Sequence, residues 1–210
     1  MLTRTRTIIA CATAAVALGS GGTAALATTT ATTWTVAPGG AFTGALPTGK
    51  LITFKDVTTN AGVSCSVSSL SGSLKSGSGL SGRGIGAITD VSQPGHCSAT
   101  MSIAFGRNPG LRAMSYNPTT GVTSGRLTFL HVSFSVTSPV NCSMVVDGTS
   151  DTADNGYVPF KYTNATAVVK TIVGGSLHVF DSNCPGLNSG DKAAFISTYK
   201  LSPGQTITSP

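Results

Sequence analysis

The chain has 210 residues, with 13 Lys and Arg against seven acidic residues, and charged side chains make up only 10% of it. Globular proteins usually carry about a quarter charged residues, so Ser, Thr, Gly and Asn must build much of this surface. The arginines after the first 27 residues are spread out and form no basic cluster, which excludes the clustered patch that nucleic-acid binding requires.

The N-terminus predicts an export signal over Met1–Ala27. Arg4 and Arg6 precede an apolar run from Ile8 to about Leu18, and Ala25–Ala27 gives the small-residue cleavage pattern. The apolar run is shorter than the ~20 residues that span a bilayer. We therefore expect cleavage before Thr28, a secreted or cell-envelope-associated product and no membrane span after removal of the signal. The remaining 11 basic and seven acidic residues give a net charge of +4.

Cysteine number predicts two disulfides in the exported chain. Cys11 lies in the signal, which leaves Cys65, Cys97, Cys142 and Cys184. Three pairings are possible, and we favour Cys65–Cys97 with Cys142–Cys184 because each bridge then closes one half of the chain. Zinc is not expected, because no CxxC occurs and no His stands at ligand spacing from a Cys.

Alternation of apolar and small polar residues predicts antiparallel strands with one buried face. The clearest examples are Ser98–Phe105, Leu130–Val136 and Val158–Tyr162. Further strands are expected at Leu51–Val57, Val63–Leu70, Ile85–Val91, Ser143–Asp147, Val168–Val173, Leu177–Asp181 and Phe195–Leu201.

Turn residues separate these runs, as at Asp154-Asn155-Gly156, and no helical periodicity follows Ala27. The expected fold is all-β: an antiparallel β-sandwich or barrel of about 10–13 short strands stapled by two disulfides. The expected organisation is a signal (1–27), a flexible leader (28–33) and a single all-β domain (34–210). The glycine-rich segment Ser71–Gly86 is expected to be a flexible loop or a pair of close-packed strands.

A weak internal echo leaves open that the domain consists of two related halves. Cys65-Ser66 is followed by Gly72-Ser73, and Cys142-Ser143 is followed by Gly148-Thr149. Ser and Gly are so frequent here that chance is a serious competing explanation of the echo.

No group of residues predicts catalysis, so no catalytic or cofactor-binding residue is expected. Three histidines (His96, His131, His178) and many serines are present, but no GxSxG elbow occurs. Ser197–Lys200 matches SxxK in letters only, because it lies on an alternating strand. Most aspartates stand beside turn residues, which explains them without the paired carboxylates of a glycosidase.

The densest polar cluster is Asp147, Asp151, Asp154 and Asn155. Oxygen ligands of this kind suit calcium, which makes the three aspartates calcium candidates. The spacing does not match an EF-hand and the bidentate Glu is missing, so ordinary turn chemistry is the favoured interpretation.

The order of several short stretches resembles a family of small secreted actinobacterial (Streptomyces-type) proteins of unknown function. The resemblance covers nearly the whole exported chain and rests on Trp34–Val36, Pro38–Gly40, Ser71–Gly82, Gly84–Gly86, Val146–Thr149, Ala153–Gly156, Gly174–His178 and Ser202–Thr208. It implies export and the disulfide pattern, and it implies no functional residue.

These observations predict a secreted, non-catalytic binding or surface module at the cell envelope, with cell-wall glycan as one partner class. The first alternative is an extracellular carrier of a small apolar ligand. The second is a secreted hydrolase or a hydrolase inhibitor, with Ser182–Gly190 as the inhibitory loop. A carrier requires an apolar cavity, a surface module requires none, and an enzyme requires a His and an Asp that converge in a cleft.

Overall fold

A computed structural model describes residues 32–92 and 94–210. The expected signal and all of the expected leader except Thr32 and Thr33 lie outside the described residues. β1 begins at Thr33, one residue before the expected start of the domain. Within the described ranges there is no helix, and so none of a length and apolarity that would cross a membrane.

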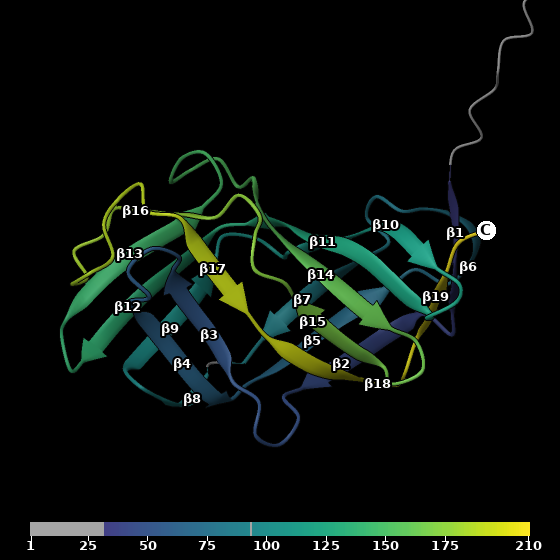
Figure 1. The fold of residues 1–210 in the computed structure, drawn as a ribbon, viewed down its shortest axis with the longest axis horizontal. Coiled ribbons are helices and arrows are strands. Elements are labelled where there is room, and N and C mark those ends of the chain that lie inside the picture. The colour runs from purple at the N-terminus through teal and green to yellow at the C-terminus, as the bar shows by residue number, and fades with distance from the viewer. Residues whose placement is uncertain (1–31, 93) are drawn as a thin grey trace, which may run out of the picture. The chain divides into compact units, whose positions relative to one another are not determined.

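Nineteen strands make up the described part of the chain (Figure 1). They are β1 (Thr33–Ala37), β2 (Gly40–Ala45), β3 (Ile52–Asp56), β4 (Gly62–Val67), β5 (Ser69–Leu74), β6 (Gly77–Ser81), β7 (Gly86–Val91), β8 (Gly95–Cys97), β9 (Thr100–Phe105), β10 (Gly110–Asn117), β11 (Val122–Leu130), β12 (Val132–Ser138), β13 (Cys142–Asp147), β14 (Gly156–Thr163), β15 (Val168–Thr171), β16 (His178–Phe180), β17 (Ala193–Ile196), β18 (Thr198–Ser202) and β19 (Thr206–Thr208).

Eight strands form a closed antiparallel barrel in the order in which they occur along the chain. β2, β5, β7, β10, β11, β14, β15 and β18 each pair with the next, and β18 closes the barrel on β2 through Lys200 opposite Ala45. This is an up-and-down barrel, the arrangement in which eight strands leave an interior filled by side chains or by one small ligand.

The wall of the barrel continues into two four-stranded sheets with the same strand order. Sheet β9-β12-β13-β16 extends β10, β11, β14 and β15, while sheet β8-β4-β3-β17 extends β7, β5, β2 and β18. In Figure 1 the sheets lie on the left and the barrel on the right. The sheets pack face to face, with the rings of Phe54 and Phe134 stacked at a centroid distance of 4.8 Å. We call the level where the barrel divides into these sheets the waist.

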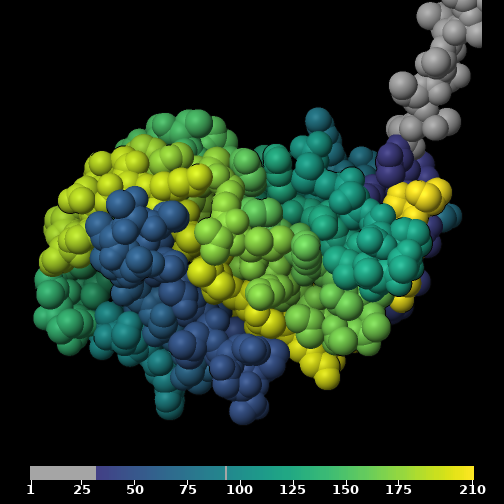
Figure 2. Space-filling view, in the orientation of Figure 1, coloured from purple at the N-terminus to yellow at the C-terminus, as the bar shows by residue number. Residues whose placement is uncertain are grey.

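Single residues interrupt three of the long strands at the waist. Ser68 separates β4 from β5, His131 separates β11 from β12, and Ser197 separates β17 from β18. The interruptions account for three of the strands beyond the 10–13 expected, since each of these runs is counted as two. β2, β8, β10 and β19 lie where no strand was expected. Figure 2 shows the blue residues of β3 and its turn against the yellow-green segment before β17. The Lys192 carbonyl accepts a hydrogen bond there from Val57 N at 2.9 Å.

A three-stranded sheet, β19-β1-β6, closes the barrel end away from the two sheets. Trp34, Val36 and Ile207 from this sheet are all buried. Gln205, before β19, is also buried: its amide oxygen accepts from Gly39 N, and its backbone N–H donates to the hydroxyl of Tyr162.

The two disulfides connect as expected, Cys65–Cys97 and Cys142–Cys184. The first joins neighbouring strands β4 and β8, and the second ties the start of β13 to the loop after β16. The disulfides indicate an oxidising, extracellular-type environment.

The glycine-rich segment contains strands that do not pair with each other. β5 lies in the barrel between β2 and β7, while β6 pairs with β1 in the end sheet. The two residues of the internal echo also differ in setting, since Gly72 lies within β5 and Gly148 lies in the loop after β13. Sheet β9-β12-β13-β16 takes its strands from residues 100–180, and sheet β8-β4-β3-β17 takes its strands from residues 52–97 and 193–196.

Candidate functional site

An apolar cavity of about 130 Å³ lies in the interior. Its wall includes Phe42, Leu111 and Phe160 from the barrel and Phe54, Ile103 and Phe134 from the two sheets. The cavity wall therefore draws on the barrel and on both sheets.

The polar side chains that reach this cavity already have partners inside the protein. The hydroxyl of Tyr199 lies 2.9 Å from the hydroxyl of Ser68, and Thr171 Oγ1 donates to the Phe195 carbonyl at 2.9 Å. Tyr162 donates to the Gln205 carbonyl at 2.6 Å. Burial raises the pKa of both tyrosines above the usual 10.0, which keeps them neutral. The wall thus offers a ligand apolar surface and no unpaired polar group.

Glycines let the two large rings of the barrel interior lie against bare backbone. A Cβ on Gly72 would come within 2.4 Å of Phe42 Cζ, and a Cβ on Gly125 would come within 2.5 Å of Phe160 Cζ. Both distances are shorter than a van der Waals contact, so a side chain at either position would force the neighbouring ring or backbone to shift.

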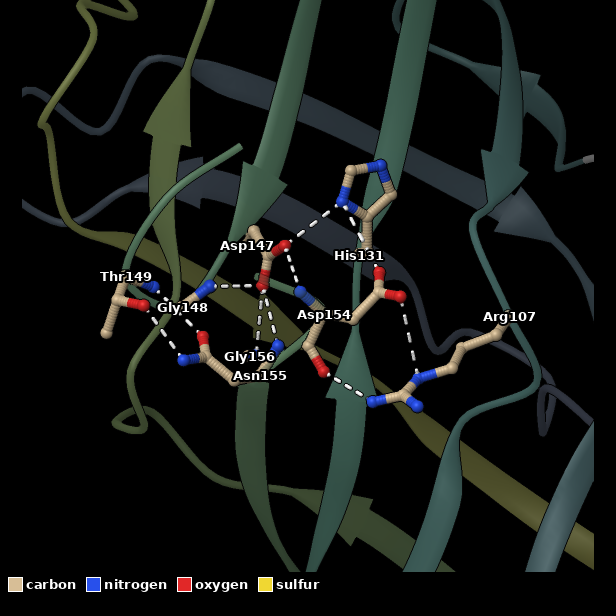
Figure 3. A network of polar contacts seen from close by, with 8 residues as sticks. All are labelled: Arg107, His131, Asp147, Gly148, Thr149, Asp154, Asn155 and Gly156. Carbon is tan, nitrogen blue, oxygen red and sulfur yellow. Dashed lines mark hydrogen bonds and ion pairs between the residues drawn. The ribbon is translucent and has the colours of Figure 1, made fainter. Parts of the chain in front are cut away.

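The expected polar cluster forms a second candidate site at the waist, built around Asp147 (Figure 3). Asp147 ends β13 and is 0% exposed. Its Oδ1 accepts hydrogen bonds from the backbone N–H groups of Gly148 (2.6 Å), Asn155 (3.0 Å) and Gly156 (3.1 Å). Its Oδ2 accepts from Asp154 N at 2.8 Å and lies 3.0 Å from His131 Nδ1. One buried carboxylate therefore organises the whole loop between β13 and β14.

Opposing effects act on the pKa of Asp147. Burial raises it, but the hydrogen bonds from Gly148, from the His131 ring and from the amides of Asp154 and Asn155 outweigh burial and hold the pKa below 3.8. Asp147 is therefore charged at neutral pH, and its charge is compensated by oriented donors.

Arg107 joins the network from the connection between β9 and β10. Its guanidinium donates to the Asp154 carbonyl at 2.8 Å and lies 3.8 Å from the Asp154 carboxylate (Figure 3). The same guanidinium lies 3.9 Å from the ring centroid of Phe129, at the bulge near the end of β11. These contacts fasten the β9–β10 connection to the loop after β13.

The calcium candidates are only partly brought together. His131, Asp147 and Asp154 are the one group of potential metal ligands found within the described ranges, and Asp151 is not part of it. Both Asp147 oxygens already serve as acceptors, so a cation would have to displace backbone N–H groups. The geometry is that of a turn organised by a carboxylate.

The pairing of Asp147 with His131 is the geometry in which a carboxylate orients a catalytic base. No serine hydroxyl is hydrogen-bonded to His131 among the described residues, and neither His131 nor Asp147 lines the apolar cavity. His178 also contacts the loop, with Nδ1 3.1 Å from the Gly148 carbonyl, while His96 is exposed on β8. Ser197 is buried and bonded to Thr171.

The inhibitory-loop candidate Ser182–Gly190 is anchored to the body of the protein. Its Cys184 is bridged to Cys142, Asn183 Oδ1 accepts from Ser143 N at 2.6 Å, and Leu187 is buried. Six of its nine residues are nevertheless exposed, Pro185 among them, so the loop is both anchored and accessible to a partner.

Sequence reasoning missed two features of the site region. It assigned no residue to a cavity wall, because the pattern of a strand shows which of its faces is buried but does not show whether the buried faces of different strands leave a space between them. It also missed Asp56, which ends β3 and is 0% exposed. The hydrogen bond from Thr59 N lowers the pKa of Asp56 most, burial opposes it, and the hydrogen bonds from Thr59 Oγ1 and Thr58 N lower the pKa further. Asp56 thus organises the β3–β4 turn as Asp147 organises its own loop.

No family model matches this chain, and no curated protein or solved structure matches it significantly. Function has to be inferred from the cavity and the network themselves.

Proposed function

We propose that this protein is a secreted carrier that holds a small apolar molecule in the cavity of its barrel and performs no chemical step. The observation that carries the proposal is the apolar cavity of about 130 Å³, whose polar neighbours are already paired. The two disulfides and the N-terminal signal pattern support work outside the cell.

The cavity volume sets the size of the ligand. An apolar void of ~150 Å³ lined by Leu, Ile and Phe stays dry and takes up benzene or xenon. A cavity of about 130 Å³ therefore suits one ring or a short alkyl chain.

The cavity favours a carrier over a surface module of the cell envelope. An unfilled void lowers stability by ~24 cal/mol per Å³, so about 130 Å³ costs about 3 kcal/mol relative to a filled core. A surface module gains nothing from such a void, whereas a carrier needs it.

Benzene binding tests the proposal directly. We expect benzene to raise the melting temperature of the wild-type protein, corresponding to about 2.7 kcal/mol at a hundredfold excess over Kd. Val132 lines the cavity on β12, so Val132→Phe should fill it and abolish the shift without lowering the starting stability. Native mass spectrometry of protein from culture supernatant should show extra mass that is lost on denaturation.

An absence of any benzene shift in the wild-type protein, together with an empty native mass, would refute the carrier. Retention of that same protein on cell-wall polysaccharide would then favour the surface module.

A further inference from the structure

One seam of the barrel wall opens at the waist, between β7 and β9. The ladder between β7 and β10 pairs Gly110 with Ala87 and Leu111 with Gly86, and Ile88 N donates to the Pro109 carbonyl at 2.9 Å. Beyond this point β7 pairs with β5, and β9 pairs with β12. No ladder joins β7 to β9 in residues 32–92 and 94–210.

A surface hollow of about 230 Å³ occupies this seam. Eight residues of β7, β9 and the β9–β10 connection line it, and five of them also line the apolar cavity. These five are Ile88, Val91, Ile103, Phe105 and Pro109. The hollow and the cavity therefore share these five side chains, and we call the hollow the β7/β9 mouth.

The opposite seam is closed by backbone hydrogen bonds. Between β16 and β17, Val179 N donates to Asp191 O at 2.8 Å, and Ala193 N donates to Leu177 O at 2.9 Å. The far end of the barrel is covered by β1, β6 and β19. The β7/β9 seam, by contrast, has a hollow that shares the cavity wall.

The rim of the mouth is polar and carries one charge. The three lining residues that do not reach the cavity are Thr89, Asp90 and Asn108, and all three are exposed. The Asp90 carboxylate makes no hydrogen bond or ion pair with a described residue, so it can accept hydrogen bonds from a ligand. A carboxylate at this rim attracts a cation and repels an anion.

We propose that the ligand is an amphiphile that passes through the β7/β9 mouth, places its short apolar part in the cavity and leaves a hydrogen-bond-donating, preferably cationic, head group at Asp90 and Asn108. This inference rests on the proposed carrier function and adds the class of ligand and its route. Apolar contacts supply the affinity, while the polar rim fixes the orientation.

A matched series of head groups tests the ligand class. Hexylamine, hexanol and hexanoate share one chain, and calorimetry should rank their affinities in that order. A unit charge pair at 4 Å in water is worth about fivefold in affinity, so Asp90→Asn should weaken hexylamine by about that factor and leave hexanol unchanged. Asp181→Asn removes another exposed carboxylate that lines neither hollow, and it should change nothing.

A bulky side chain at the rim tests the route. Asn108→Trp should slow association and dissociation of hexanol by about fivefold or more, with little change in Kd. Thr119→Trp, in the exposed turn between β10 and β11, is the control and should change neither rate.

The outcomes separate the two proposals. Failure of benzene and of every hexyl ligand to bind would refute the carrier itself. Binding of hexanol with no preference for hexylamine over hexanoate would overturn the head-group assignment. Binding with rates unaffected by Asn108→Trp would overturn the route through the β7/β9 mouth.

Discussion

Replacing Asp147 by Asn tests whether one buried carboxylate holds the waist together. The substitution preserves shape but replaces one acceptor oxygen by an NH2 group. If the remaining oxygen takes the place of Oδ1, the amides of Gly148, Asn155 and Gly156 keep an acceptor. The N–H of Asp154 then faces another donor, while His131 can turn acceptor by changing tautomer.

The cost follows from these bonds. An unsatisfied buried donor costs about 1–3 kcal/mol, and three hydrogen bonds to a charge become weaker bonds to a neutral group, so we expect a total loss of about 3–5 kcal/mol. Urea denaturation at neutral pH should show this loss as a lower midpoint at unchanged slope. The control is Asp181→Asn, whose exposed side chain makes no hydrogen bond with described residues, and it should stay within about 0.5 kcal/mol of wild type.

The effect of pH has a definite sign. The pKa of Asp147 in the folded protein lies below its usual 3.8, so its stabilisation is present above pH 3.8 and is lost as the pH falls through the folded value. The stability difference between wild type and Asp147→Asn should therefore shrink in acid. A difference below about 0.5 kcal/mol at neutral pH, or one that does not change in acid, would refute the account of the network.

Three further outcomes are expected. Gly125→Ala should lower the free energy of unfolding in urea by about 1–3 kcal/mol, because the added Cβ meets Arg112 O and the buried ring of Phe160. Gly95→Ala is the control and should be nearly neutral, because its added Cβ lies 3.5 Å from Val67. Removal of either disulfide by paired Cys→Ala substitution should lower the free energy of unfolding by about 4 kcal/mol, as expected for closed loops spanning 32 and 42 residues. Equal stability of the bridged and unbridged proteins would contradict this expectation. Because burial raises the pKa of Tyr162 and Tyr199, their contribution to stability should be fully present below pH 10.0 and should fall as the pH rises above it. Melting curves at alkaline pH, recorded with tyrosinate absorbance, would detect unfolding and ionisation together.

Strand patterning predicted the all-β class because alternation depends only on which neighbours face the core. Ser98–Phe105 and Val158–Tyr162 illustrate this, since half-buried residues in β9 and buried residues in β14 recur at every second position. The glycine-rich strands β5 and β6 carry little apolar alternation, so their strand character comes from pairing partners far away in the chain. Closure of the barrel through β18 and β2 is likewise a long-range event that no local pattern encodes.

The candidate site was foreseen only where it is local in sequence. Asp147, Asp154 and Asn155 stand within nine residues, and the turn chemistry expected of them is what the structure shows. His131 and Arg107 belong to the same network but come from the break between β11 and β12 and from the β9–β10 connection, so sequence spacing gave no reason to group them. The cavity depends on the volume left between side chains from both sheets and the barrel, which is a property of packing alone.

The polar network and the proposed mouth are mechanically linked through one short connection. Gly106–Pro109 joins β9 to β10: its Arg107 binds the Asp154 loop, and its Asn108 and Pro109 line the hollow. The Gly106 N–H donates to the His131 carbonyl at 3.0 Å, next to the ring held by Asp147. One edge of the mouth, the β9–β10 connection, is therefore bonded to the loop after β13, whose shape depends on the buried Asp147 carboxylate. The other edge, β7, is held by its pairing with β5. The proposed route needs the gap between these two edges, which no ladder spans within residues 32–92 and 94–210, so we expect the Asp147 network to set where the proposed mouth lies.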